Sequence, residues 1–123
     1  MTKDIFNQGM IVRREVLGEQ HVDRAESNKD EFTEEFQELI TKYAWGEIWT
    51  RPGLERKTRS CITLAMMIAL HREDEFKLHI KAALNNGLSK DEIKEVILQS
   101  AIYAGVPAAN SAFHWAQDVF NNL

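Results

Sequence analysis

The chain has 123 residues, of which 44% are hydrophobic and 28% charged, a composition that suits one folded domain and excludes a disordered chain. The net charge of −4 comes from 19 acidic and 15 basic residues spread along the sequence, which excludes a basic nucleic-acid-binding surface. No apolar stretch reaches the roughly 18 residues that cross a bilayer, and no apolar signal core follows the first residues. We therefore expect a cytoplasmic protein with a single domain, residues 1–123, and neither nucleic acid nor membrane as a partner.

Residues 1–28 are the least regular part of the sequence. Their apolar residues give only a weak helical stripe, made of Ile11, Val12, Val16, Leu17 and Val22. We expect this segment to be an N-terminal arm that packs on the rest of the bundle or on a neighbouring subunit.

The segment 30–45 predicts an amphipathic helix. Glu and Lys residues fill one side, and the other side carries the apolar stripe Phe32, Phe36, Leu39, Ile40 and Tyr43. A turn follows at 51–54, because Pro52 pre-sets one backbone torsion angle and Gly53 supplies a permissive one.

Two helices are predicted directly after this turn, over 55–71 and 73–85. The second ends at Asn86 and Gly87, a pair that suits the left-handed residue found at helix ends.

Two more helices complete the chain. Ser89 and Glu92 form a capping box, which begins a helix that runs to Tyr103. Pro107 suits the first position of the last helix, which ends near Phe120. The expected fold is therefore all-α, a single-domain bundle of about six helices.

The helix around 61–70 is apolar on nearly every face. Such a helix is either central in its own fold or buried by another chain, and a small domain offers few neighbours to cover it. We therefore expect a homo-oligomer. Cys61, the only cysteine, lies here, and an apolar surround raises a thiol pKa, so an unreactive buried thiol is favoured over a nucleophile.

His79 and Glu75 lie four residues apart on one predicted helix, close enough for the carboxylate to orient the imidazole and raise its basicity. They are candidates for a catalytic acid–base pair, and a surface Glu–His contact is the alternative. His71 suits a helix C-terminus, and His114 suits either a pocket wall or a hydrogen-bonded core position. The four histidines are not spaced as ligands and no cysteine cluster exists, so we expect no metal.

One turn of the sequence combines two tryptophans with a carboxylate and an arginine: Trp45, Glu47, Trp49 and Arg51. Aromatic walls with an arginine suit a flat organic acid, which makes these residues candidates for substrate binding. The alternative is that the tryptophans only anchor the helix junction. Arg59, near the start of the apolar helix, needs a charged partner, which a substrate carboxylate or Glu55 would supply.

Several stretches can be taken together: Tyr43–Leu54, Lys57–Ser60, His79–Leu88, Tyr103–Asn110 and, near the N-terminus, Arg13–Gly18. They resemble the carboxymuconolactone decarboxylase family of the alkylhydroperoxidase-D-like superfamily. The likeness covers nearly the whole chain, and the tryptophan-rich turn is specific to the decarboxylase branch.

The resemblance implies both an architecture and an activity. The architecture is an all-helical subunit in a homohexamer, a trimer of dimers. The activity is that of a carboxy-lyase: cofactor-free decarboxylation of γ-carboxymuconolactone (4-carboxymuconolactone) to β-ketoadipate enol-lactone, in the protocatechuate branch of the β-ketoadipate pathway. The only partner it implies besides other subunits is the small lactone dicarboxylate.

Redox members of the superfamily carry a cysteine pair seven and four residues before the histidine that matches His79, where this sequence has Arg72 and Glu75. Their upstream glutamate is replaced by Ser60. Because one cysteine cannot form the disulfide that dithiol peroxidases need, peroxidase chemistry is excluded.

The implied substrate is its own electron sink. Electrons left by the departing carbon dioxide delocalise through the ring double bond into the lactone carbonyl, so neither an organic cofactor nor a metal is needed. In this scheme His79, oriented by Glu75, delivers the proton or hydrogen-bonds the oxyanion. Arg51 and Arg59 bind carboxylate groups.

The tryptophan turn, with Trp45 and Trp49 beside Glu47, then walls the ring from water. Two alternatives stay open. One is a family member that acts as a decarboxylase or hydrolase on a different lactone or organic acid. The other is a non-catalytic helical oligomer that binds aromatic acids.

Overall fold

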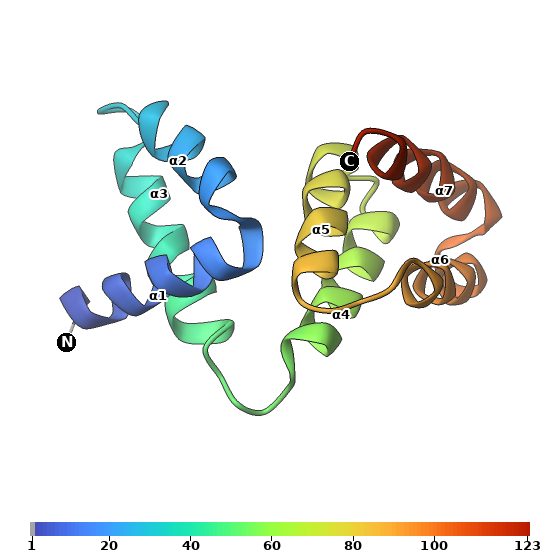
Figure 1. Cartoon of the computed structure of the whole chain (residues 1–123), viewed down its shortest axis with the longest axis horizontal. Coiled ribbons are helices and arrows are strands. Elements are labelled where there is room, and N and C mark those ends of the chain that lie inside the picture. The colour runs from blue at the N-terminus through green and yellow to red at the C-terminus, as the bar shows by residue number, and fades with distance from the viewer. Residues whose placement is uncertain (1) are drawn as a thin grey trace. The chain divides into compact units, whose positions relative to one another are not determined.

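The computed structural model describes residues 2–123, with side chains from Asp4 onward, and every regular element in this range is a helix (Figure 1). The all-α prediction is therefore confirmed. These residues form seven α-helices and one π-helix, more than the six expected, because the segment predicted as an irregular arm forms two regular helices. None of the described helices is long and apolar enough to cross a membrane.

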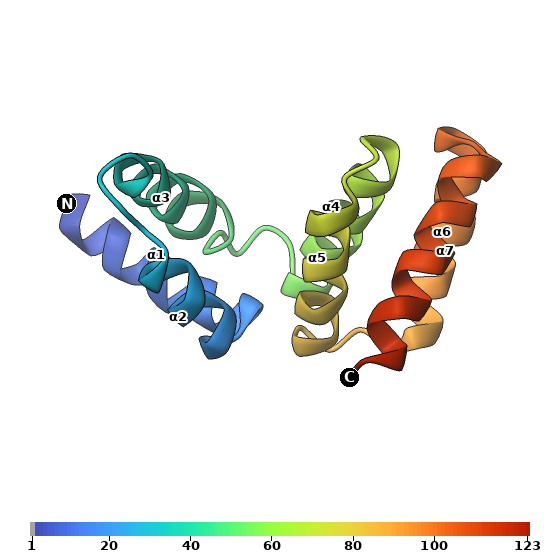
Figure 2. The same ribbon diagram turned by 90° about the horizontal axis from the view of Figure 1, so that it is seen from above.

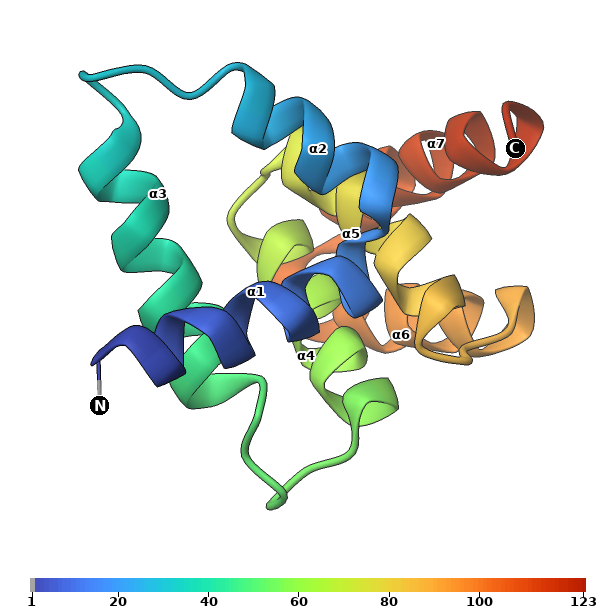
Figure 3. The same cartoon turned by 60° about the vertical axis from the view of Figure 1, so that its left-hand side comes forward.

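The chain divides into two compact units, Met1–Glu55 and Arg56–Leu123. The first contains α1 (Thr2–Leu17), α2 (Glu19–Ser27), α3 (Glu34–Ile40) and the π-helix η1 (Thr41–Ile48), which continues α3. α1 packs across η1, as Figure 3 shows. The buried apolar residues of this first unit are Val12, Val16, Leu17, Val22 and Trp45.

Two glycines allow α1 and η1 to touch backbone to backbone. A Cβ atom on Gly9 of α1 would lie within 2.2 Å of the Thr41 carbonyl oxygen, and one on Gly46 of η1 within 2.7 Å of the Ile5 carbonyl oxygen. Both separations are far shorter than real Cβ contacts. Only glycine at these two positions lets the helices approach so closely.

The helix predicted over 30–45 is present but differs in two ways. It begins at Glu34, and from Thr41 onward its hydrogen bonds widen into those of a π-helix. Its predicted apolar stripe is largely exposed, with Phe32 at 94% of its maximal accessible surface. The residues buried in the first unit lie on the other side, where Thr41, Trp45 and Gly46 meet α1.

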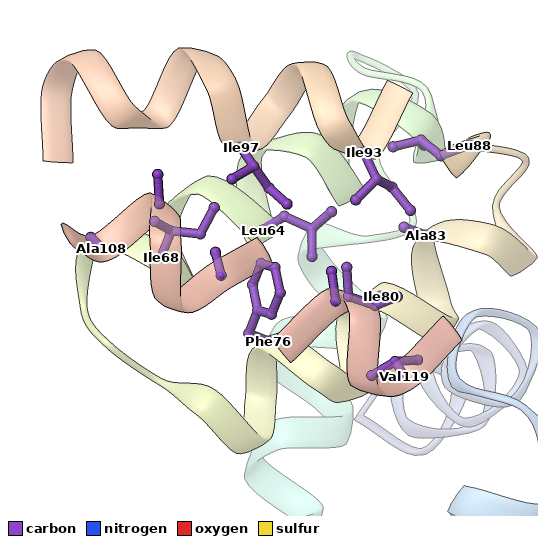
Figure 4. Packing of buried hydrophobic residues seen from close by; sticks show 13 residues of the cluster. Leu64, Ile68, Phe76, Ile80, Ala83, Leu88, Ile93, Ile97, Ala108 and Val119 are labelled. Carbon is purple, nitrogen blue, oxygen red and sulfur yellow. The ribbon is translucent and has the colours of Figure 1, made fainter. Parts of the chain in front are cut away.

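The second unit consists of α4 (Arg56–Ala69), α5 (Glu73–Asn85), α6 (Lys90–Ala104) and α7 (Val106–Asn121). Figure 2 shows the two hairpins, α4 with α5 and α6 with α7, lying side by side. Their facing sides form one apolar core, drawn in Figure 4. Its largest fully buried side chains are Phe76, Leu64, Ile68, Ile80, Ile93 and Ile97.

The local signals in this unit gave the right helix ends. Gly87 adopts the left-handed conformation after α5, with φ at 97°. Ser89 accepts a hydrogen bond from the Glu92 amide while the Glu92 side chain accepts one from the Ser89 amide, so the predicted capping box is confirmed. Pro107 lies in the first turn of α7.

The helix α4, predicted to be apolar on nearly every face, is buried on one side only. Leu64 and Ile68 enter the core, whereas Ile62, Met66 and Leu70 are exposed. Between α4 and α6 runs an open groove of about 600 Å³, and Cys61, Ala65, Val96 and Tyr103 are among the residues that line it. A single copy of the chain thus leaves a broad apolar surface in contact with water.

Candidate active site

The two tryptophans of the predicted binding turn stand against each other. The ring centroids of Trp45 and Trp49 are 5.1 Å apart, and the ring planes are tilted by 30°. Trp45 is buried and Trp49 half-buried. The Trp49 amide donates to the Ala44 carbonyl at 2.9 Å, the five-residue bond of a π-helix. The turn thus presents an aromatic surface whose inner ring is fixed by packing.

The charged side chains of this turn face the solvent. Glu47 and Arg51 are both exposed. The Thr50 hydroxyl donates to the Gly46 carbonyl at 2.6 Å, and the Arg51 amide donates to the Ile48 carbonyl at 3.0 Å. These bonds satisfy carbonyls at the end of the π-helix and fold the chain back after Trp49.

A buried arginine that the sequence reasoning did not select lies against the start of η1. Arg13 of α1 is only 5% exposed. Its guanidinium donates to the side-chain oxygen of Gln37 at 3.1 Å and to the hydroxyl of Thr41 at 3.4 Å. Burial lowers the pKa of Arg13, and the nearby charge of Glu26 partly opposes this. The structure therefore places a desolvated cation beside the tryptophan-bearing helix.

In the second unit, the start of α4 is tied to the end of α5. Ser60 is fully buried, and its hydroxyl accepts a hydrogen bond from the side-chain nitrogen Nδ2 of Asn86 at 2.9 Å. Arg59, the neighbouring candidate, is half-buried, and its Nε atom is closed off from solvent. Arg59 thus lies in a helix turn that the Asn86–Ser60 hydrogen bond holds in place.

The predicted acid–base pair lies on α5. The carboxylate of Glu75 accepts a hydrogen bond from Arg72, and this bond is the main reason why the pKa of Glu75 is lowered. The charge of His79 lowers it further but by less. His79 is half-buried, with its Nδ1 atom closed off from solvent. Glu75 and His79 are therefore electrostatic neighbours, but the first partner of Glu75 is Arg72, which the sequence analysis did not foresee.

The surroundings of Cys61, within α4, and of His71, just after it, agree with the unreactive interpretations of these two residues. Burial, followed by the charge of Glu92, raises the pKa of the Cys61 thiol. His71 lies in the turn that follows α4 and makes an edge-to-face contact with Trp115, with ring centroids 6.2 Å apart. Among residues 2–123, no three His, Cys, Asp or Glu side chains gather as metal ligands would.

The model of the carboxymuconolactone decarboxylase family matches residues 34–118. The chain is 52% identical to a 4-carboxymuconolactone decarboxylase of Acinetobacter baylyi over 96% of this chain and 88% of that protein. It is 42% identical to the nitrosuccinic acid decarboxylase npaB of Metarhizium robertsii over 97% of this chain and 83% of that protein.

The chain belongs to the carboxymuconolactone decarboxylase family. The segment that matches the family contains every candidate residue, namely Trp45, Glu47, Trp49, Arg51, Arg59, Glu75 and His79. A shorter relative, a 4-carboxymuconolactone decarboxylase of Pseudomonas putida, is 49% identical over 37% of this chain and 94% of its own length.

Arg72 and Glu75, which the superfamily resemblance matches to the redox cysteines, form an ion pair in this structure. Ser60, which the resemblance matches to the upstream glutamate, accepts a hydrogen bond from the side chain of Asn86. All three residues are therefore polar groups with hydrogen-bond partners in the chain.

The sequence analysis missed Arg13 and the hydrogen bond between Asn86 and Ser60, and only the first could have been recognised from the sequence. Arg13 interrupts the apolar stripe of 11–22 next to Val12 and Val16, which is an unusual place for a charge. The hydrogen bond from Asn86 to Ser60 joins residues 26 apart in the chain, and no local sequence pattern predicts such a contact.

Proposed function

We propose that this chain is a carboxy-lyase that decarboxylates 4-carboxymuconolactone to β-ketoadipate enol-lactone without a cofactor. The observation that carries this proposal is the 52% identity, over nearly the whole of both chains, to a protein named 4-carboxymuconolactone decarboxylase. The protocatechuate branch of the β-ketoadipate pathway is the setting in which this lactone arises.

The reaction breaks one carbon–carbon bond and forms one carbon–hydrogen bond. The γ carbon of the lactone loses its carboxylate as carbon dioxide, and the electron pair moves through the ring double bond into the lactone carbonyl. The resulting dienolate takes a proton on the carbon α to that carbonyl. The protein must therefore exclude water from the departing carboxylate, stabilise the oxyanion and supply one proton.

The tryptophan turn supports the first of these tasks. The half-buried ring of Trp49 offers an apolar wall to the lactone ring, the buried ring of Trp45 packs behind it, and the exposed guanidinium of Arg51 follows Trp49 by two residues. We assign Arg51 to a carboxylate of the substrate, because a planar guanidinium pairs with a carboxylate through two hydrogen bonds. Glu47 and Arg59 keep the substrate-binding roles expected from the sequence.

The hydrogen bond between Arg72 and Glu75 supports His79, and not Glu75, as the proton donor of the predicted pair. Its hydrogen bond from Arg72 keeps the Glu75 pKa low, so this carboxyl is ionised at neutral pH and is a poor proton donor. We therefore assign to His79 the delivery of the proton or the hydrogen bond to the oxyanion.

The activity is tested by following the ultraviolet absorbance of the lactone with purified protein treated with a chelator. We expect loss of lactone with release of one carbon dioxide per product. In deuterium oxide, delivery of the proton by the enzyme places deuterium on a single face of the α carbon. Lactone loss at the uncatalysed rate would refute the activity, and deuterium on both faces would refute proton delivery by a fixed residue.

The acid–base assignment is tested by His79→Ala and Glu75→Gln. We expect kcat to fall about a hundred-fold or more for His79→Ala, the usual contribution of a general acid. Glu75→Gln should lower kcat less, because the imidazole remains. If both variants keep kcat within a few-fold of the parent, the assignment fails.

The role of Arg51 is tested by Arg51→Ala, with Arg24→Ala as the matched control because Arg24 is an exposed arginine on α2. Loss of a charge-assisted hydrogen bond should raise KM about ten-fold. An unchanged KM, or an equal rise in the control, removes Arg51 from the site.

A second candidate substrate class follows from the relative named nitrosuccinic acid decarboxylase. Nitrosuccinate has a succinate skeleton whose nitro group can accept the electrons left by the neighbouring carboxylate. The lactone also carries its departing carboxylate and its –CH2–COO⁻ arm on one carbon. We therefore expect weak activity on nitrosuccinate, measured as release of carbon dioxide in parallel with the lactone. A kcat/KM higher for nitrosuccinate would make it the preferred substrate.

We further propose that the subunit works as a homohexamer, a trimer of dimers, in the cytoplasm. The exposed stripe Phe32, Phe36, Leu39 and Tyr43 and the exposed apolar side chains of α4 and α6 support an oligomer. Sedimentation velocity tests the state, and Ile102→Glu should dissociate it if α6 lies in an interface. Sedimentation of the parent as a monomer would contradict the proposal.

A further inference from the structure

The guanidinium of Arg13 bridges the junction at which an α-helix becomes a π-helix. One of its acceptors, Gln37, lies in α3, and the other, Thr41, is the first residue of η1. The Thr41 hydroxyl also donates to the Gln37 carbonyl at 2.8 Å. The hydroxyl thus uses its hydrogen toward α3 and its oxygen toward α1, so its position is fixed from both sides.

If Arg13 served only to fill space, burying its charge would cost stability without a benefit. Arg13 is 5% exposed, its ion pair with Glu26 is long at 3.9 Å, and Glu26 lies closer to Lys29, at 2.9 Å. Among the residues described, the Nε atom of Arg13 is buried without a hydrogen-bond partner. A well-packed apolar residue commonly gives equal or better stability than a buried charge. The N–H groups of the Arg13 guanidinium, in contrast, fix the geometry between α1, α3 and η1.

The geometry it defines is that of the tryptophan turn. Thr41 begins the π-helix, and Trp45 follows it by four residues, within the same short helix. A π-helix is rarely stable by itself and needs its surroundings to hold it. Here the surroundings are α1, which presents Gly9 to the Thr41 carbonyl and Arg13 to the Thr41 hydroxyl. α1 therefore contacts the first turn of η1 at two points on the same residue.

We propose that Arg13 is a positioning residue for the Trp45–Trp49 pair: through Thr41 and Gln37 it holds the π-helical register that keeps the two rings against each other. Its effect on catalysis rests on the proposed function, in which the pair walls the substrate. Its effect on the rings does not, so the two can be tested separately.

The first test reads the rings directly. Two indoles 5.1 Å apart and tilted by 30° couple their strong far-ultraviolet transitions and give a paired circular dichroism signal. Trp49→Phe sets the zero of this signal, and Trp115→Phe is the control that leaves it intact, because Trp115 contacts Phe76 and His71 instead.

The variants form a matched series at both ends of the bridge. Arg13→Met removes the charge and the fork, and Arg13→Lys keeps only the charge. Thr41→Val removes the hydroxyl, and Thr41→Ser restores it. We expect the paired signal to lose most of its amplitude in Arg13→Met and Thr41→Val, part of it in Arg13→Lys, and little in Thr41→Ser, with helix content preserved.

The second test reads the lactone kinetics of the same folded variants. A displaced aromatic wall should raise KM about ten-fold while kcat falls less, and Thr41→Ser should recover the parent KM. If Thr41→Val and Arg13→Met lower the melting temperature but keep the paired signal and KM, Arg13 is merely structural and the proposal is overturned. If the parent shows no lactone activity, the proposed function fails, and the ring signal alone decides on Arg13.

Discussion

The two units of the chain are both helical but are held together by different means. In Arg56–Leu123, facing helices bury Leu, Ile, Phe and Ala side chains in one continuous core. In Met1–Glu55, a backbone contact at Gly9 and Gly46 and a buried arginine accompany a much smaller set of apolar residues. The apolar core of the second unit tolerates substitutions by residues of similar shape. The contacts of the first unit depend on individual atoms, and they hold the helix that carries Trp45.

The largest effect is expected where the apolar core is thickest. Phe76→Ala should destabilise the second unit by about 3–5 kcal/mol, because Phe76 is fully buried and packs on Trp115. Ile80→Val in the same core should cost only about 0.5–1.5 kcal/mol. Urea unfolding followed by Trp115 fluorescence, with Trp45 and Trp49 replaced by Phe, measures both. A smaller loss for Phe76→Ala than for Ile80→Val would contradict this account of the core.

The matching change in the first unit is far smaller in volume. Gly9→Ala adds one methyl group, which would meet the Thr41 carbonyl. Alanine gains up to about 1 kcal/mol in helix propensity, but overpacking costs about 1–3 kcal/mol, and the backbone cannot yield easily, so we expect net destabilisation. Gly53→Ala, which meets nothing within 4 Å, is the control. Fluorescence of the tryptophan pair in a Trp115→Phe chain measures both, and equal stabilities would argue against the close contact.

The end of α4 offers a smaller test in which the backbone alone changes. His71 has a φ of 57°, and the amides of His71 and Arg72 bond back to the carbonyls of Ile68 and Met67 in a left-handed helix ending. His71→Gly should be more stable than His71→Ala by about 1 kcal/mol, because both lose the ring but only glycine is unstrained there. Thermal unfolding of the pair measures the difference. Alanine at least as stable as glycine would show that this turn carries no strain.

The smallest effect concerns the exposed pair at the start of α5. The pKa of Glu75 is lowered from 4.5 in the folded state by the hydrogen bond from Arg72. A carboxyl with a lowered folded pKa stabilises the fold above its unfolded pKa, and this contribution is lost as the pH falls through the folded pKa. Because the pair is exposed, we expect only about 0.2–1 kcal/mol, reduced by salt. Urea midpoints of the parent and Glu75→Gln should differ at neutral pH and converge in acid, and a constant difference would point to another cause.

The helices of the second unit could be predicted because their signals are local. Gly87, the Ser89–Glu92 box and Pro107 each specify a helix end within a few residues, and the structure uses each of them as expected. The turn with Trp45 and Trp49 could be selected from the sequence for the same reason, because its residues lie close together in the chain. The single domain over 1–123 and the roles of the candidate residues stay predictions.

The first unit was harder to predict because its structure depends on contacts between distant residues. The stripe of 32–43 suggested one buried face, but α1 packs on the opposite face through Thr41 and Gly46. A π-helix has no sequence signature of its own, since the partner helix decides whether the wider turn is tolerated. The bond between Arg72 and Glu75, in contrast, was within reach of the sequence, because the two residues lie three apart at a helix start.

The π-helix also sets a length rule for this part of the chain. Each of its hydrogen-bonded turns holds one residue more than an α-helical turn, so η1 is equivalent to an α-helix with one inserted residue. Deletion of a single residue within 41–48 would let an ordinary α-helix form. Because the wider turn had accommodated the extra residue, the residues after the deletion would stay on nearly the same side of the helix. A single deletion here should therefore displace Trp49 and Arg51 less than a deletion in an α-helix, where every later residue rotates by about 100° around the helix axis.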